Sequence, residues 1–176
     1  MKKKSIIIAI IAILVIAIIL FIVYKNGNII NGKQIIAEDS HINWAWGFSY
    51  SGTIICDDGS VYKFSMTDNE KEYSESYEDL KKLNKSILNN TTEYVCKISK
   101  DEINKIKEYS KNIKNENYTE NYAGGTDMGQ SSIIIWNYES NKRITLITSG
   151  DWEGKNSSSN VNELINLVQK YTIFRK

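Results

Sequence analysis

The sequence predicts an α+β fold, in which an N-terminal transmembrane helix precedes one ectodomain with an antiparallel sheet and about three packed helices. Three observations lead to this prediction. An uninterrupted apolar run stands near the N-terminus, two hairpin patterns follow it, and three stretches carry apolar residues at helical spacing. The expected order of elements after the membrane helix is ββαβαββα.

The apolar run covers residues 6–24 and contains no charged residue. A helix of this length spans about 28 Å, close to the ~30 Å hydrocarbon core of a bilayer. A cleavable signal peptide is the alternative, but its apolar region is usually ~7–15 residues long and ends at small residues. Three lysines precede the run and only Lys25 directly follows it. We therefore expect an uncleaved anchor in the cell membrane, with residues 1–5 cytoplasmic and residues 26–176 extracellular.

The rest of the chain has the length and charge of a single ordinary domain. Residues 25–43 show no sustained period and are predicted to form a stalk, which leaves residues 44–176 for the extracytoplasmic domain. All 21 acidic residues follow Lys25, whereas 22 minus 4 leaves 18 basic residues, so the net charge there is −3. We therefore expect no nucleic-acid partner, because such a partner requires a clustered basic face.

The first half of the domain is predicted to form a hairpin, a helix, a strand and a second helix. Residues 52–56 and 61–65 flank Asp58-Gly59, and Gly supplies the positive φ angle of a tight turn. Apolar residues recur at helical spacing over residues 70–89, and residues 93–98 form a short strand. Ser99 and Glu102 then make a capping box that opens the second helix. Residues 114–130 are expected to be a loop.

The second half is predicted to contain another hairpin and a last helix. Residues 132–137 and 143–148 pair, and the first of these segments carries apolar residues on both faces, which is typical of a strand covered on both sides. Ser159 or Asn160 caps the final helix.

Residue types exclude two large enzyme classes. His41 is the only histidine, so neither a Ser-His-Asp triad nor a multi-histidine metal site can form, and we expect no cofactor and no metal. Carboxylate chemistry remains, because paired carboxylates can act as acid and base. Its candidates lie beside glycines in predicted loops, where aspartate is also an ordinary turn residue: Asp57, Asp58, Asp127 and Asp151.

The most suggestive segment for binding is the aromatic run from Trp44 to Tyr50. In an extended segment, alternation puts Trp44, Trp46, Phe48 and Tyr50 on one side, where they can stack on sugar rings or anchor a protein partner. Trp152, in the loop after the second hairpin, is a further candidate. The alternative is that the aromatic run is the first core strand, because large aromatic residues also dominate cores.

The two cysteines, Cys56 and Cys96, both fall on the inward faces of predicted strands. An exported location permits a disulfide. If the two strands were neighbours, the bond would close a loop of about 40 residues and add roughly 3–4 kcal/mol. Buried thiols are the alternative.

The chain resembles small single-span extracytoplasmic proteins of low-GC Gram-positive bacteria. This resemblance depends on the Lys- and Ile-rich anchor and on Trp46-Gly47-Phe48-Ser49-Tyr50-Ser51-Gly52 before the Asp-Gly hairpin. The sequence favours a non-catalytic domain that binds a protein or an envelope polymer. A carboxylate-dependent cell-wall hydrolase and a purely structural membrane protein are the alternatives.

Overall fold

The computed structural model describes residues 15–16, 32–67 and 69–172. The chain divides between Lys33 and Gln34, and the sheet with its packed helices belongs to the unit that begins at Gln34. The expected anchor at residues 6–24 lies outside the described residues, except for Val15 and Ile16, which are helical. Residues 1–5 also lie outside them. In the part of the chain that the structure describes, no helix is both long and apolar enough to cross a membrane.

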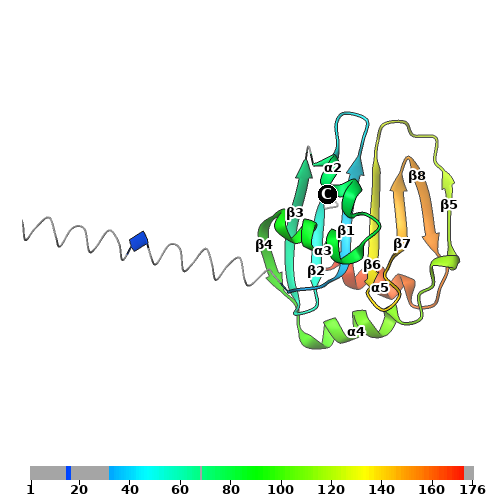
Figure 1. The fold of residues 1–176 in the computed structure, drawn as a ribbon. Coiled ribbons are helices and arrows are strands. Elements are labelled where there is room, and N and C mark those ends of the chain that lie inside the picture. The colour runs from blue at the N-terminus through cyan, green and yellow to red at the C-terminus, as the bar shows by residue number, and fades with distance from the viewer. Residues whose placement is uncertain (1–14, 17–31, 68, 173–176) are drawn as a thin grey trace, which may run out of the picture. The chain divides into compact units, whose positions relative to one another are not determined.

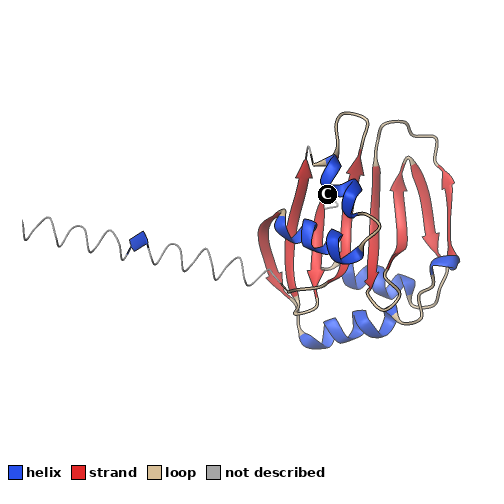
Figure 2. Ribbon diagram, viewed as in Figure 1, coloured by secondary structure: helices blue, strands red, loops and turns tan. Residues whose placement is uncertain are grey.

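The domain is α+β, as predicted, with one antiparallel sheet and helices packed on it (Figure 1; Figure 2). The sheet has eight strands in the order β4-β3-β2-β1-β6-β7-β8-β5. The strands are β1 (Ile35–Asn43), β2 (Ser49–Cys56), β3 (Ser60–Thr67), β4 (Thr91–Lys97), β5 (Tyr118–Tyr122), β6 (Gln130–Asn137), β7 (Lys142–Gly150) and β8 (Trp152–Asn156). The helices are α2 (Glu70–Ser76), α3 (Leu80–Asn89), α4 (Lys100–Ser110), the short 3-10 helix η1 (Asn115–Asn117) and α5 (Val161–Gln169).

The prediction that residues 25–43 form a stalk is wrong for its second half. Ile35–Asn43 is β1, a central strand that pairs with β2 on one side and β6 on the other. Its first six residues are buried, including Glu38 and Asp39. The sequence shows no strand period here because these polar side chains are buried among partners that come from distant parts of the chain.

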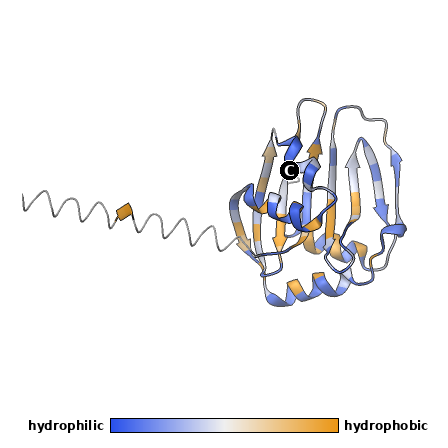
Figure 3. Cartoon of the chain, in the orientation of Figure 1, coloured by the Kyte–Doolittle hydropathy of each residue, from blue (hydrophilic) through white to orange (hydrophobic). Residues whose placement is uncertain are grey.

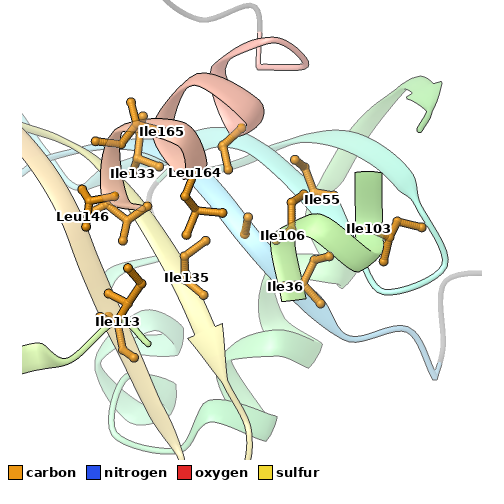
Figure 4. Close-up of a cluster of buried hydrophobic side chains, with 14 of the residues drawn as sticks. Ile36, Ile55, Ile103, Ile106, Ile113, Ile133, Ile135, Leu146, Leu164 and Ile165 are labelled. Atoms are coloured by element: carbon orange, nitrogen blue, oxygen red, sulfur yellow. The ribbon is translucent and has the colours of Figure 1, made fainter. Parts of the chain in front are cut away.

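One apolar layer lies between the sheet and the helices α4 and α5 (Figure 4). β6 contributes Ile133 and Ile135 to this layer, and both side chains are fully or almost fully buried. The layer consists mainly of branched aliphatic residues: Ile36, Ala37, Ile55, Val61, Ile98, Ile103, Ile106, Ile113, Ile144, Leu146, Val161, Leu164, Ile165 and Val168. β6 also buries Ile134 and Trp136 toward the opposite face, so the prediction of a strand covered on both sides is confirmed.

A second layer of buried side chains lies on the opposite face of the sheet, under α2 and α3, which in Figure 1 cover β1 to β3. The helix predicted over residues 70–89 is two helices, because Asp79 caps α3 by accepting hydrogen bonds from the backbone N–H groups of Lys81 and Lys82. In Figure 3 the hydrophobic residues concentrate on the central strands, whereas β5 at one edge is hydrophilic.

Both predicted hairpins are present, as β2–β3 and β6–β7. The turn of the first contains Gly59 at a φ of 87°. The capping box of Ser99 and Glu102 opens α4 as expected. Asn160 is the N-cap residue of α5, but its side chain makes no capping hydrogen bond. The sequence missed β5 and β8, which lie in segments expected to be loops.

Of the two alternatives considered for Cys56 and Cys96, the disulfide is not formed. Cys56 lies on β2 and Cys96 on β4, and β3 runs between these strands. Two strands that are separated by a third lie about 10 Å apart, beyond the ~7 Å between Cα atoms that a disulfide can bridge. No disulfide joins the two residues.

Candidate ligand-binding pockets

The predicted row of four aromatic rings is divided between the surface and the core. Residues 44–47 form a loop between β1 and β2, not an extended strand. Trp44 and Trp46 are exposed, by 51% and 84%, whereas Phe48 and Tyr50 are buried. The Trp44 ring still contacts the buried layer, with its centroid 4.9 Å from that of Phe48. The loop therefore holds one tryptophan against the domain and presents the other to solvent.

Trp152 lies close to the same loop, although it is far from it in sequence. It is the first residue of β8, and the Gln130 side chain fixes its backbone through two hydrogen bonds, at 3.0 and 3.2 Å. Its ring lies 5.4 Å from that of Tyr122 in an edge-on arrangement. Trp44 and Trp152 line one surface pocket of about 390 Å³. The other lining residues are polar or small, apart from one isoleucine: Ile42, Asn43, Ala45, Asp127, Gly129, Gln130 and Asp151.

A second pocket, of about 570 Å³, lies on the α2 side of Trp44. Tyr73 and Tyr77 contribute rings to it, and the Trp44 and Tyr73 centroids are 5.9 Å apart. The remaining lining residues are Ile42, Trp44, Ser74, Glu75 and Glu78. Ile42 and Trp44 belong to both pockets, so the two are neighbours. We call them together the Trp44 pockets.

Tyr50 is 2% exposed and belongs to a buried polar cluster on the same face of the sheet as the Trp44 pockets. The centre of this cluster is the fully buried carboxylate of Glu38. Tyr50 and Ser40 donate hydrogen bonds to its Oε1 atom at 2.7 and 2.9 Å, and Arg143 donates to the same atom at 2.5 Å. The indole N–H of Trp136 donates to Oε2 at 2.7 Å. We call these five residues the Glu38 cluster.

The Glu38 cluster holds an ion pair among neutral phenols. Burial raises the pKa of Tyr50 well above its usual value, and burial raises the pKa of Tyr73 to about 12. Burial by itself lowers the pKa of Arg143, but the charge interactions with Glu38, Tyr50 and Tyr73 and the hydrogen bond to Glu38 together outweigh it, so the net shift is upward. The Arg143 guanidinium also lies within 5.6–5.9 Å of the ring centroids of Trp136, Tyr77 and Tyr50. This geometry favours a permanent cation that is neutralised by Glu38.

The four aspartates of the hydrolase hypothesis do not converge. Asp57 and Asp58 lie in the β2–β3 turn, where they accept hydrogen bonds from the backbone N–H groups of Gln34 and Ser60. Asp127 and Asp151 lie at the other end of β1 and line the first of the Trp44 pockets. Asp151 accepts a hydrogen bond from the backbone N–H of Met128 at 3.1 Å. Asp127 and Asp151 therefore share one pocket, whereas Asp57 lines a separate pocket of about 500 Å³.

Comparison with models of protein families, with curated proteins and with solved structures gives no match. The site must accordingly be interpreted from its own residues.

Sequence reasoning identified Trp44, Trp46, Tyr50 and Trp152 as binding candidates, of which Tyr50 is buried, but it missed Glu38 and Arg143. Glu38 was assigned to a stalk, and Arg143 was treated only as the start of a strand. One signal for Arg143 was present, because the chain has 20 lysines and two arginines. In such a lysine-rich chain, an arginine inside a strand suggests a site that needs a planar, ring-stacked guanidinium.

Proposed function

We propose that this chain is a non-catalytic binding domain, that residues 6–24 hold it at the outer face of the cell membrane, and that the Trp44 pockets bind its ligand. The observation that carries the proposal is the meeting of exposed aromatic rings from separate segments around two adjacent pockets. Trp44 comes from the β1–β2 loop, Trp152 from β8 and Tyr77 from the segment after α2.

The exposure of these rings favours a role in binding. Tryptophan and tyrosine are enriched among the residues that dominate binding energy, and they act best on a rigid scaffold. Trp46 is 84% exposed and adds little to the core. The loop that carries it is held on both sides, since β1 and β2 pair through Asn43 and Ser49. Both pockets combine aromatic rings with several polar or charged side chains, and such polar groups can orient a bound ligand.

The place of the pockets in the domain is consistent with this proposal. β1 begins at Ile35, next to the N-terminal segment of the chain, and ends at Asn43, beside the first pocket. Its nine residues span roughly 26 Å. The pockets therefore lie at the opposite end of β1 from the point where the chain enters the sheet.

The proposal is tested by photo-crosslinking in intact cells of the natural host. A photoreactive phenylalanine analogue replaces Trp46 or Trp152, and in a control variant it replaces Tyr94, an exposed aromatic residue on edge strand β4. We expect one discrete adduct from positions 46 and 152 and none from position 94. Absence of adducts from both tryptophan positions, or the same adduct from all three, would contradict the proposal.

The cell-wall hydrolase is the second candidate, because Asp127 and Asp151 line the same pocket. The two hypotheses separate in an assay of purified cell wall incubated with the full chain. We expect no release of soluble fragments. Release that disappears in the Asp127→Asn variant, while the Asp57→Asn variant stays active, would establish the hydrolase instead.

A further inference from the structure

The charges around the Trp44 pockets define the ligand more closely. Asp127 and Asp151 line the first pocket, and Glu75 and Glu78 line the second. Among the described residues, no lysine or arginine lines either pocket. Lys71 forms an ion pair with Glu75, with 3.8 Å between the charged atoms, and both of these side chains are largely exposed. Such a surface pair is weak.

The cation beneath the pockets does not reverse this charge. The Arg143 guanidinium lies 5.7 Å from the ring centroid of Tyr77, which lines the second pocket. However, Arg143 is paired with Glu38 at 2.5 Å, and its side chain is only 13% exposed. A ligand in the pockets therefore meets carboxylates that carry a net negative charge.

The aromatic walls favour the same kind of ligand. Indole and phenol faces attract ammonium and guanidinium groups, most strongly where water is partly excluded. The first pocket combines Trp44 and Trp152 with two carboxylates, and the second combines Tyr73 and Tyr77 with two others. Anionic polymers would be repelled by both pockets. A neutral glycan could stack on the rings but would not use the excess negative charge.

We propose that the Trp44 pockets bind a basic polypeptide segment of another protein, with lysine or arginine side chains seated between the aromatic rings and the carboxylates. This inference rests on the proposed binding function and adds the chemical class of the partner. Opposite charge on the two partners would also accelerate their association and make it sensitive to salt.

The test measures binding to the full chain in neutral detergent by isothermal titration calorimetry. The probes are an arginine–glycine repeat peptide, a glutamate–glycine peptide of the same length and a neutral chitin oligosaccharide. We expect only the arginine peptide to bind. Its affinity should fall as NaCl rises from about 0.1 to 1 M, because the Debye length shortens from about 10 to 3 Å.

A charge-neutralised variant locates the binding. The triple change Glu75→Gln, Glu78→Gln and Asp127→Asn removes three lining carboxylates but keeps Asp151, which holds the backbone of Met128. We expect the Kd to rise about tenfold or more, as for the loss of several surface charge pairs. The control changes Glu108 and Glu116 to Gln, two exposed acids outside the pockets, and should leave Kd nearly unchanged.

The outcomes separate this inference from the proposed function. Oligosaccharide binding that Trp44→Ala removes, without peptide binding, would overturn the basic partner and keep the binding domain. Binding of no probe, together with no crosslinked adduct from positions 46 and 152, would overturn both. Equal weakening by the two charge variants would assign the binding to general attraction and overturn the basic-peptide site.

Discussion

The Glu38 cluster and the Trp44 pockets are neighbours on one face of the sheet and use the same residue types, yet they differ in how their groups are satisfied. Each carboxylate oxygen of Glu38 accepts at least one hydrogen bond, and its charge is paired with Arg143. In the Trp44 pockets, by contrast, Trp44 is half exposed and carboxylates line both pockets. Aromatic rings and acids therefore stabilise the fold where they are buried with internal partners, and offer a binding site where they line an open pocket.

Breaking the ion pair of the Glu38 cluster should produce the largest effect. In Arg143→Met the Glu38 carboxylate stays fully buried without its cation, so we expect a loss of about 3–5 kcal/mol in the free energy of unfolding. Urea denaturation of the full chain measures this change. The matched control is Lys63→Met, which removes the exposed pair with Glu93 and should cost less than about 1 kcal/mol. Equal losses in the two variants would contradict the structural role of the cluster.

Removing one hydroxyl from the cluster should have a smaller effect. Tyr50→Phe deletes a donor to Glu38 and an acceptor for Arg143, whose Nη2 lies 2.9 Å from the hydroxyl oxygen. Because the ring remains, the expected cost is about 1–3 kcal/mol for the unsatisfied buried groups. Tyr94→Phe removes a hydroxyl from an exposed ring and should change stability by less than about 0.5 kcal/mol. The comparison uses denaturation midpoints, and a neutral Tyr50→Phe variant would argue against the cluster.

The sequence predicts the locally determined parts of the fold but not those that depend on distant partners. Alternation and an Asp-Gly turn identify the first hairpin, and a capping box identifies the start of α4. β1 was missed because the partners that satisfy the buried Glu38 include Trp136 and Arg143, which lie 98 and 105 residues further along the chain. β5 was missed because an edge strand with mostly exposed residues has no apolar alternation.

The candidate site shows the same division between local and distant information. The aromatic run pointed to Trp44 and Trp46, and the loop after the second hairpin pointed to Trp152, but no local pattern shows that Trp44 and Trp152 line one pocket. Strand order decides this, because it brings the end of β1 beside the start of β6 and then β7 and β8. The same strand order separates Cys56 from Cys96, which the sequence had considered as a pair.

A change in the exposed loop beside the pockets should affect binding far more than stability. Trp46→Ala removes a ring that is 84% exposed, so the free energy of unfolding should change by less than about 0.5 kcal/mol. The yield of the adduct formed from position 152 should fall severalfold if the ring is a binding anchor. Trp136→Ala removes a ring that is only 4% exposed and a hydrogen-bond donor to Glu38. It should therefore lower the free energy of unfolding much more than Trp46→Ala does. A large stability loss in the Trp46 variant would place that ring in the core instead.

The smallest expected effect lies outside both regions, at the contact between α4 and α5. Hydrogen bonds from Lys170, Tyr171 and Ser99 lower the pKa of Glu102 from 4.5 to about 2. Because the folded form releases this proton more readily than the unfolded chain, the stabilisation is complete above about pH 4.5 and disappears as the pH falls toward 2. The Tm difference between the parent and Glu102→Gln should therefore be small at neutral pH and vanish near pH 2. Glu108→Gln, on the exposed side of α4, should show no such trend, and a Glu102 difference that grows in acid would contradict the assignment.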